Sequence, residues 1–265
     1  MGEVTDLLEA CAEAARRGGA VLRERWGQQR TLEYKGGIDL VTDADRASEE
    51  ALLGFLRDRF PASAILAEES GASGAATAPL RFFVDPLDGT TNYAHGVPHF
   101  SVVVAVEDGR GLAAGATYDP LRGELFLAGR GLGAKLGGTP IRVSGTDSLE
   151  RALLCTGFPY DVHERPQLPV ALFATLLTRA RAIRRFGSAA LDLAWVACGR
   201  FDGFWEMKLK PWDVASGILM VREAGGMVAD FGGGQDMLHG GTICAANPVL
   251  QPRLLDALRE ARRGR

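Results

Sequence analysis

The segment FFVDPLDGTTNYAH, residues 82–95, places two aspartates, Asp85 and Asp88, at the end of an apolar stretch that is expected to form a strand. Because two like charges repel each other, either a cation lies between them or the segment is only a turn. A β-turn followed by a helix N-cap is the simpler interpretation, since Pro86 suits the second position of a turn and Gly89 suits its exit. The choice depends on whether further carboxylates converge on the same point.

Other carboxylates stand where they could join this pair. Glu68 and Glu69 end the segment AILAEES, which is also expected to be a strand, and Asp213 opens a predicted helix directly after Trp212. No histidine or cysteine stands beside these carboxylates. A ligand set made only of oxygen atoms suits hard cations, so the sequence predicts Mg²⁺ rather than Zn²⁺.

The charge of this set matches two divalent ions. Four negative charges come from Glu68, Asp85, Asp88 and Asp213, and Asp85 lies between the others, where it could bridge both ions. Two ions about 4 Å apart stabilise the attacking and the leaving oxygen of a phosphoryl displacement and lower the pKa of a bound water. The pattern therefore predicts hydrolysis of a phosphate ester by metal-activated water, without a covalent phosphoenzyme.

The residues around the two aspartates favour the same chemistry. Pro86 restricts the chain so that the carbonyl of Leu87 can turn inward as a neutral metal ligand. Gly89, Thr90 and Thr91 then begin a turn or helix whose free amides can hold a phosphate group.

The composition is that of an ordinary globular protein. Of the 265 residues, 46% are hydrophobic and 24% are charged, so the chain can bury a sizeable core. The net charge of −3 predicts no affinity for nucleic acid or acidic membranes, and no apolar run is long enough to span a bilayer. The acidic, amphipathic N-terminus lacks the order of a signal peptide, and the four scattered cysteines are expected to be reduced thiols. These features predict a cytoplasmic protein.

The first part of the chain is expected to be an α+β layer. Helices are predicted over 5–26 and 42–60 from the spacing of their apolar residues. A loop of small residues is expected over 71–79. Strands are expected over 64–70, 81–85, 100–109, 111–119 and 123–129, the last three as an antiparallel meander.

From about residue 151 strands and helices alternate, which indicates an α/β layer. The helices are expected over 164–180, 188–199, 213–224 and from Pro248 onward, and the strands over 152–157, 182–186, 203–207, 226–230 and 242–247. No linker separates the two parts. Residues 1–265 are therefore expected to fold as one unit, with an α+β half (about 1–150) and an α/β half (about 151–265).

The two aspartate motifs resemble the signatures of the inositol monophosphatase family, which comprises Mg²⁺-dependent, lithium-sensitive phosphatases, here of the bacterial inositol-1-monophosphatase type. FVDPLDGTTNYAH and WDVASGILMVREAGG stand in the expected order and match at every diagnostic position. The similarity extends through KGGIDLVTDAD, LAEES, TGFPY, RRFGSAALDLAWVACGRFDGFWE and CAAN, and so covers most of the chain. The resemblance implies a layered αβαβα sandwich, two or three Mg²⁺ ions per site and a homodimer.

The resemblance also implies roles for single residues. The family's metal ligands correspond to Glu68, Asp85, Asp88, Asp213 and the carbonyl of Leu87, of which Glu68 and Asp88 would also take part in catalysis. Thr90 resembles the residue that, together with Asp45, orients the nucleophilic water. Asp45 also stands at the N3 position of a capping box that begins at Thr42, so helix capping is the competing interpretation for it.

On the substrate side, Glu206 resembles the carboxylate that accepts sugar hydroxyls, and Lys35 lies in a segment similar to the family's mobile active-site loop. Ordinary surface positions are the competing interpretations for both side chains. The full set of residues expected to contact substrate is Asp88, Gly89, Thr90, Gly187, Ser188, Ala189, Glu206 and Asp213. The DGTTN form favours myo-inositol 1-phosphate over histidinol phosphate or 3′-phosphorylated nucleotides, while fructose 1,6-bisphosphate and other sugar phosphates remain alternatives.

Two basic clusters leave a different class of function open. They are Arg179, Arg181, Arg184 and Arg185, and the C-terminal Arg259, Arg262, Arg263 and Arg265. Some bacterial members of the resembled family act as partners in transcription complexes. Solvated faces are the simpler explanation of such clusters, so an enzyme is the preferred interpretation and a transcription- or RNA-associated partner protein is the alternative.

Overall fold

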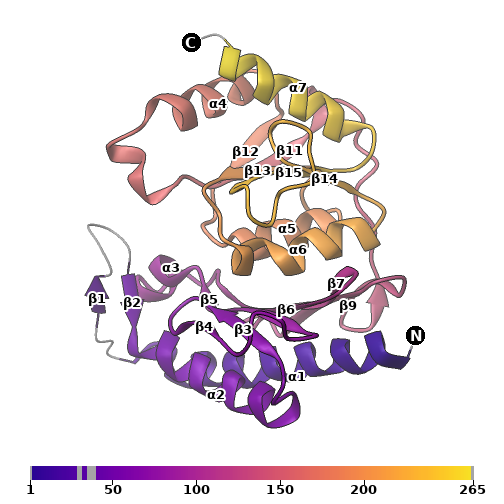
Figure 1. Ribbon diagram of the computed structural model, residues 1–265. Coiled ribbons are helices and arrows are strands. Elements are labelled where there is room, and N and C mark those ends of the chain that lie inside the picture. The colour runs from indigo at the N-terminus through magenta and orange to yellow at the C-terminus, as the bar shows by residue number, and fades with distance from the viewer. Residues whose placement is uncertain (1, 29–31, 35–39, 264–265) are drawn as a thin grey trace.

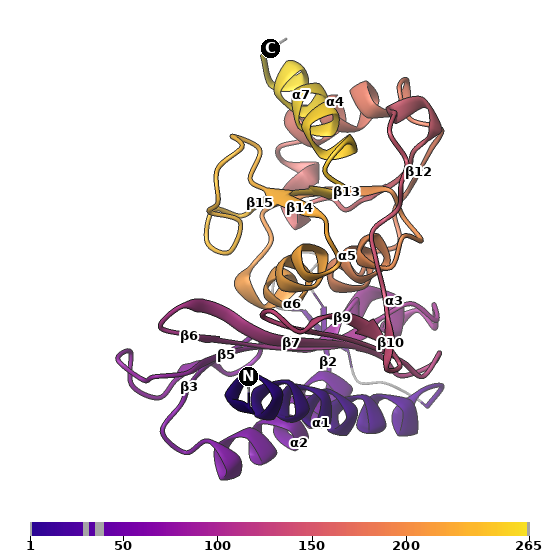
Figure 2. The same ribbon diagram turned by 90° about the vertical axis from the view of Figure 1, so that its right-hand side faces the viewer.

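Five layers are stacked in the order helix, sheet, helix, sheet, helix in the computed structural model, which describes residues 2–28, 32–34 and 40–263 (Figures 1 and 2). This arrangement confirms the αβαβα sandwich that the sequence predicts. The helices are α1 (Gly2–Arg25), α2 (Asp43–Arg59), α3 (Thr90–Ala94), α4 (Gln167–Leu177), α5 (Ala189–Ala197), α6 (Pro211–Glu223) and α7 (Leu250–Arg263), with short 3₁₀ turns η1 (Leu149–Arg151) and η2 (Tyr160–His163).

The larger sheet contains the predicted meander. Its strands are β3 (Ala64–Ala67), β4 (Gly71–Ser73), β5 (Arg81–Asp88), β6 (Ser101–Asp108), β7 (Gly111–Asp119), β8 (Glu124–Gly129), β9 (Gly133–Leu136) and β10 (Thr139–Pro140). They lie in the order β10-β9-β8-β7-β6-β5-β3-β4, and β3 runs parallel to β5. A separate hairpin joins β1 (Leu32–Tyr34) to β2 (Leu40–Thr42).

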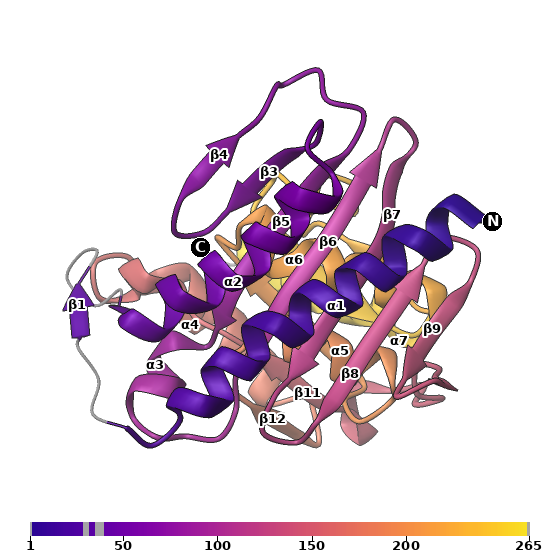
Figure 3. The same cartoon turned by 90° about the horizontal axis from the view of Figure 1, so that it is seen from below.

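Helices α1 and α2 cover the outer face of this sheet (Figure 3). Helix α1 buries one stripe that includes Leu7, Cys11 and Leu22, as its apolar spacing predicts. A glycine on the same stripe, Gly18, lets α1 approach α2 closely, since a Cβ there would lie 2.7 Å from the Ser48 hydroxyl oxygen. The two helices thus form one rigid layer under the strands.

The smaller sheet forms the fourth layer, and α4 and α7 cover its outer side (Figure 1). Its strands are β11 (Leu153–Thr156), β12 (Ala182–Arg184), β13 (Gly203–Met207), β14 (Met227–Ala229) and β15 (Thr242–Ala246), in the order β12-β11-β13-β15-β14. Strand β13 is parallel to β11 and antiparallel to β15.

Helices α5 and α6 lie between the two sheets (Figure 2). Their apolar residues share one buried cluster with side chains of the larger sheet, including Phe126 and Ala128, and with strands of the smaller one, including Phe204 and Ile243. This shared core supports the proposal that residues 1–265 fold as one unit.

Three local features differ from the prediction. Strand β4 occupies Gly71–Ser73, inside the segment expected to be a loop, because the exposed edge of β3 supplies backbone partners to residues of low strand propensity. Strands β9 and β10 extend the meander beyond residue 129. Helix α6 begins at Pro211, two residues before the predicted start, because proline is well suited to the first helical position.

The contact between α5 and α6 generates a stability prediction. Gly217 of α6 lies against Leu193 of α5, where an added Cβ would stand 2.6 Å from the leucine Cβ. Gly217→Ala should therefore destabilise the fold by about 1–3 kcal/mol in urea unfolding, although alanine is the better helix former.

The matched control is Gly54→Ala. Gly54 is exposed on α2 with open space around it, so the same substitution should stabilise by about 0.5–1 kcal/mol. Equal effects of the two substitutions would contradict the close packing of α5 on α6.

Candidate active site

Two parallel strands bring the first carboxylates to one edge of the larger sheet. Strand β3 pairs with β5 so that Ala67 lies opposite Val84, and the Glu68 amide donates to the Val84 carbonyl at 3.1 Å. The carboxyl ends of parallel strands meet at the same edge of a sheet. Glu68 and Asp85 consequently follow their strands into the same region, as the sequence predicts.

A bulge in β5 turns the chain between the two aspartates. Opposite β6 the pairing register shifts between Asp85 and Asp88, so that one extra residue is accommodated on β5. Pro86 has no amide to contribute to the sheet at this point. The amide of Leu87 donates instead to Asp85 Oδ1 at 2.9 Å. The bulge places both aspartates in the same cavity.

The carboxylate of Asp88 is bound by the first turn of α5. Its Oδ2 atom accepts hydrogen bonds from the Ser188 hydroxyl at 2.5 Å and the Ala190 amide at 2.9 Å, and its Oδ1 atom accepts from the Ala189 amide at 3.2 Å. Unpaired amides at a helix N-terminus favour a negative charge. Asp88 is therefore fixed from the second half of the chain, about a hundred residues away.

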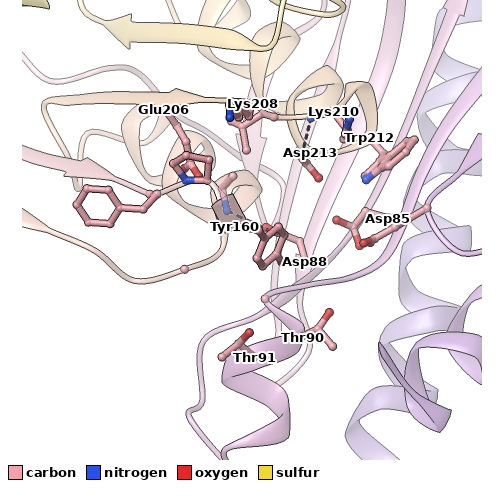
Figure 4. Close-up of a pocket in the computed structure, with 18 of the residues that line it drawn as sticks. Asp85, Asp88, Thr90, Thr91, Tyr160, Glu206, Lys208, Lys210, Trp212 and Asp213 are labelled. Carbon is pink, nitrogen blue, oxygen red and sulfur yellow. Dashed lines mark hydrogen bonds between the residues drawn. The ribbon is translucent and has the colours of Figure 1, made fainter. Parts of the chain in front are cut away.

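Asp213 reaches the site from α6. It stands at the third helical position, and its Oδ2 atom accepts a hydrogen bond from the Lys210 amide at 2.7 Å. Figure 4 shows the side chains of Asp85, Asp88, Thr90 and Asp213 around one space, with the Lys210–Asp213 bond dashed. Both halves of the protein thus supply carboxylates to one point.

Thr90 connects this group to α2. Its hydroxyl lies 3.0 Å from Asp45 Oδ1 and 3.0 Å from the Leu87 carbonyl oxygen. The other oxygen of Asp45 accepts from the Thr42 amide at 2.8 Å and from the Thr42 hydroxyl at 2.5 Å, which is the capping box that the sequence predicts. Capping and contact with Thr90 are therefore made by different oxygens of one carboxylate, so the two interpretations of Asp45 are compatible.

The carboxylates of the site resist ionisation together. Burial, followed by the negative charges of Glu68, Asp88 and Asp213, raises the pKa of Asp85 well above its usual value. Burial likewise raises the pKa of Asp213 and, to about 6, that of Asp45. Burial also raises the pKa of Asp88, although its hydrogen bonds from α5 oppose the shift. Ionised together, these groups need a positive charge among them.

The donors suit Mg²⁺ by their chemistry. Within the described part of the chain, no group of three or more His, Cys, Asp or Glu side chains already stands in the arrangement of a closed metal site. The set nevertheless consists of oxygen atoms, includes the buried Asp85 and Asp88, and is crowded by like charges that a cation would neutralise. Hard divalent cations prefer such ligands, and proteins seldom supply Mg²⁺ with a complete cage.

The four carboxylates and nearly all the residues expected to contact substrate line one cavity of about 410 Å³. Gly89, Gly187, Ala189 and Glu206 line it, while Ser188 is fully buried behind Asp88. Lys35 lies outside the described residues.

Several lining residues were not predicted. Gly157 follows β11. Only glycine leaves room there for the Glu206 carboxylate, because a Cβ at position 157 would lie 2.2 Å from Glu206 Oε1. Arg185 lines the same end and, by its positive charge, opposes the rise that burial causes in the pKa of Glu206. Gly157 lies in the TGFPY motif and Arg185 in the RRFG motif. The pattern of neighbouring residues cannot predict that the fold brings both close to Glu206 on β13.

Two loops also line the cavity and are called its rim. Tyr160 and Asp161 belong to η2, and Lys208 to the loop between β13 and α6. Lys208 forms an ion pair with Asp161 and, among the described residues, is the only one other than glycine with a positive φ, 65°. The rim belongs to other segments of the chain than the strands that position the aspartates.

Comparison with known proteins identifies the chain. The profile of the inositol monophosphatase family matches residues 3–263. The chain belongs to the inositol monophosphatase family. Among its relatives, the Nus factor SuhB of Pasteurella multocida is 41% identical over 254 residues, covering 95% of each chain. The Nus factor SuhB of Escherichia coli is 40% identical over 256 residues, covering 96% of each.

Solved structures agree with this assignment. The inositol monophosphatase from Anabaena superposes with a TM-score of 0.89 at 41% identity, covering 97% of each chain. The extragenic suppressor protein suhB from Bartonella henselae superposes with a TM-score of 0.92 at 40% identity, covering 96% of this chain and 99% of that one. The inositol monophosphatase fold is therefore shared over nearly the whole length.

The environment of Glu206 predicts a pH effect on the metal-free protein. Burial, opposed by Arg185 and reinforced by Asp88, raises the pKa of Glu206 from about 4.5 to about 8. Folded protein then keeps a proton that unfolded protein has lost, so stability falls as pH rises from about 4.5 to about 8. In EDTA, Glu206→Gln should gain roughly 2–4 kcal/mol relative to wild type between pH 5 and pH 9 in urea unfolding.

The control is Glu50→Gln, which changes an exposed glutamate on α2 and should follow the wild-type pH profile. Parallel profiles for wild type and Glu206→Gln would contradict the buried, proton-binding state of Glu206.

Proposed function

We propose that the protein catalyses Mg²⁺-dependent hydrolysis of a polyol phosphate monoester, with myo-inositol 1-phosphate as the first candidate. The observation that carries this proposal is the convergence of Glu68, Asp85, Asp88 and Asp213, from three separate elements, on one cavity. Membership of the family and the similarity to the Anabaena inositol monophosphatase support it. Lithium inhibition, through a site suited to Mg²⁺, is part of the same proposal.

The metal ligands in this proposal are the four carboxylates and the carbonyl of Leu87. Bound there, Mg²⁺ supplies Lewis-acid polarisation of the phosphoryl oxygens and increases the acidity of water. The chain fixes these donors before any ion binds, since Asp85 is held by the Leu87 amide, Asp88 by α5 and Asp213 by the Lys210 amide. Such fixed donors reduce the reorganisation that binding requires.

Thr90 and Asp45 hold the attacking water in this mechanism. The Thr90 hydroxyl is already oriented by Asp45 Oδ1 and the Leu87 carbonyl, each at 3.0 Å. The pKa of Asp45, raised to about 6 mainly by burial, is within reach of a proton acceptor that works near neutral pH. The two side chains would position the water and accept its proton as it attacks phosphorus.

The phosphate and the leaving group occupy opposite ends of the cavity in this proposal. Gly89, Thr90 and Thr91 line the phosphate end, where Gly89 has φ of 103° and a Cβ would lie 3.1 Å from the His99 carbonyl oxygen. Glu206, on the far side of Asp88 in Figure 4, would accept hydroxyl hydrogen bonds from the polyol. One carboxylate discriminates weakly among polyols, so fructose 1,6-bisphosphate and other sugar phosphates remain alternative substrates.

The relatives favour a second candidate from another class. Two relatives about 40% identical are described as Nus factors, so a role as a partner in transcription is the alternative function. The basic clusters give it limited support, because Arg179 is paired with Glu260 through two hydrogen bonds of 2.9 and 2.8 Å. Salt-dependent co-purification with RNA, without Mg²⁺-dependent phosphate release, would favour this alternative.

A homodimer also belongs to the proposal. Val97 and Phe186 are 44% and 36% exposed, and Phe186 packs against the rings of His99 and Trp195. Exposed apolar side chains of this kind are what a protein interface leaves on an isolated chain.

Replacing Asp88 tests the metal-assisted mechanism. Asp88→Asn keeps the shape of the side chain but removes one charge and turns one oxygen into a donor facing α5. Phosphate release should fall at least about a hundred-fold at saturating Mg²⁺, while circular dichroism shows a folded protein. Asp58→Asn, an exposed change on α2, should keep full activity. Near-wild-type turnover of Asp88→Asn would exclude the two-metal mechanism.

Replacing Glu206 tests the substrate. Above pH 8, where Glu206 is ionised, a hydrogen bond to its charged carboxylate contributes about 1.5–3 kcal/mol, so Glu206→Gln should lower kcat/KM for myo-inositol 1-phosphate roughly ten- to a hundred-fold. Hydrolysis of p-nitrophenyl phosphate, which has no ring hydroxyls, should fall far less. An equal loss on both substrates would assign Glu206 to the metal site or the fold, and no loss on either would remove the support for a polyol.

A further inference from the structure

One face of α2 contacts three separate segments of the site. Asp45, Ser48 and Glu49 are spaced three and four residues apart, so they lie on the same side of the helix. All three are buried, with exposed fractions of 0%, 0% and 5%. Polar groups buried in a helix are costly unless each has a partner. Each of the three has a partner in a segment that presents a proposed metal ligand or water-binding group, and Asp45 in addition accepts from Thr42 at the start of its own helix.

Glu49 holds the turn that follows Glu68. Its Oε2 atom accepts a hydrogen bond from the Glu69 amide at 3.0 Å, and its Oε1 atom accepts from the Ser70 amide at 2.9 Å. The amide of Glu68 itself donates to the Val84 carbonyl of β5. The backbone on both sides of Glu68 is therefore fixed, which determines where the Glu68 side chain can point.

Ser48 holds the bulge between the aspartates. Its hydroxyl donates to the Pro86 carbonyl at 2.8 Å, at the position where β5 is out of register with β6. The neighbours of Pro86 are Asp85 and Leu87, whose carboxylate and carbonyl are proposed ligands. Position 48 also faces the Cα of Gly18 on α1, so the space around it accepts only a small side chain.

We propose that Ser48 and Glu49 are positioning residues for metal binding, which they support by holding the backbone that presents Glu68, Asp85 and the Leu87 carbonyl. They touch neither the ions nor the substrate. This inference rests on the proposed function, and it extends the site from the ligands to the helix behind them. Groups that orient metal ligands typically change metal affinity or activity by about 10–100-fold when they are replaced.

The test measures Mg²⁺ binding directly, by calorimetric titration of Mg²⁺ into EDTA-stripped protein. Glu49→Gln replaces one acceptor oxygen with an amide NH₂ group, a donor that would face the N–H of Glu69 or Ser70, and should raise the Kd for Mg²⁺ about 10–100-fold. Ser48→Ala removes the bond to Pro86 without adding volume, and should raise the Kd about 3–30-fold. Glu50→Gln makes the same chemical change one residue along, on the exposed side, and should stay within twofold of wild type.

Kinetics separate positioning from a purely structural role. In both variants the Mg²⁺ concentration for half-maximal rate should rise with the Kd, while KM for substrate at saturating Mg²⁺ stays within about threefold. A lowered melting temperature with unchanged Mg²⁺ affinity would overturn the proposal, because the contacts would then stabilise only the fold. Loss of the near-ultraviolet circular dichroism signal in Glu49→Gln would overturn it for Glu49, leaving Ser48→Ala as the independent test.

The outcomes distinguish this inference from the proposed function. Wild-type protein that neither binds Mg²⁺ nor releases phosphate would reject the proposed function. Wild-type protein that does both, with Kd values unchanged in Glu49→Gln and Ser48→Ala, would reject only the positioning role.

Discussion

Repulsion among buried carboxylates is the constraint on which the site depends. Asp85 is 2% exposed and lies within the electrostatic influence of Glu68, Asp88 and Asp213, all negatively charged when ionised. Without a cation, such carboxylates would move apart or bind protons, because both burial and neighbouring negative charges disfavour the ionised form. The fold opposes this with fixed backbone contacts at each residue, and a bound cation would turn the same repulsion into binding energy.

The layered fold explains how carboxylates distant in sequence can be held together. Glu68 and Asp85 come from strand ends of the larger sheet, Asp213 comes from the helix layer between the sheets, and Asp88 joins the two through its hydrogen bonds to α5. Since α5 and α6 also share a core with both sheets, a displacement of one half against the other would separate the ligands. The geometry of the site is thus tied to the integrity of the whole sandwich.

Much of the fold and site could be predicted because the relevant signals are local. Strand ends, the proline and glycine around Asp85 and Asp88, and the capping box at Thr42 are each contained in a few consecutive residues. Long motifs shared with a family then supplied the layer order, which propensities alone could not give. Contacts between distant segments were out of reach: Gly157 against Glu206, or Glu49 under the turn after β3, are pairings that only the packed chain defines. Strand β4 was missed for a related reason, since its pairing comes from the neighbouring edge and not from its own small residues.

The rim of the cavity comes from loops, whereas the strand β5 and the helix α6 carry the aspartates of the site. Tyr160 and Asp161 on one loop, and Lys208 on another, line the cavity, and the ion pair between Lys208 and Asp161 joins the two loops to each other. Lys208 also holds a left-handed backbone conformation that glycine would adopt without strain. If the protein hydrolyses a phosphate ester as proposed, substitutions in these two loops would change access to the cavity, while the Leu87 amide and α5 would still hold Asp85 and Asp88. In evolutionary terms, the segments that carry the proposed metal ligands and the rim could then change independently, with Glu206 inside the cavity as a further determinant of the substrate.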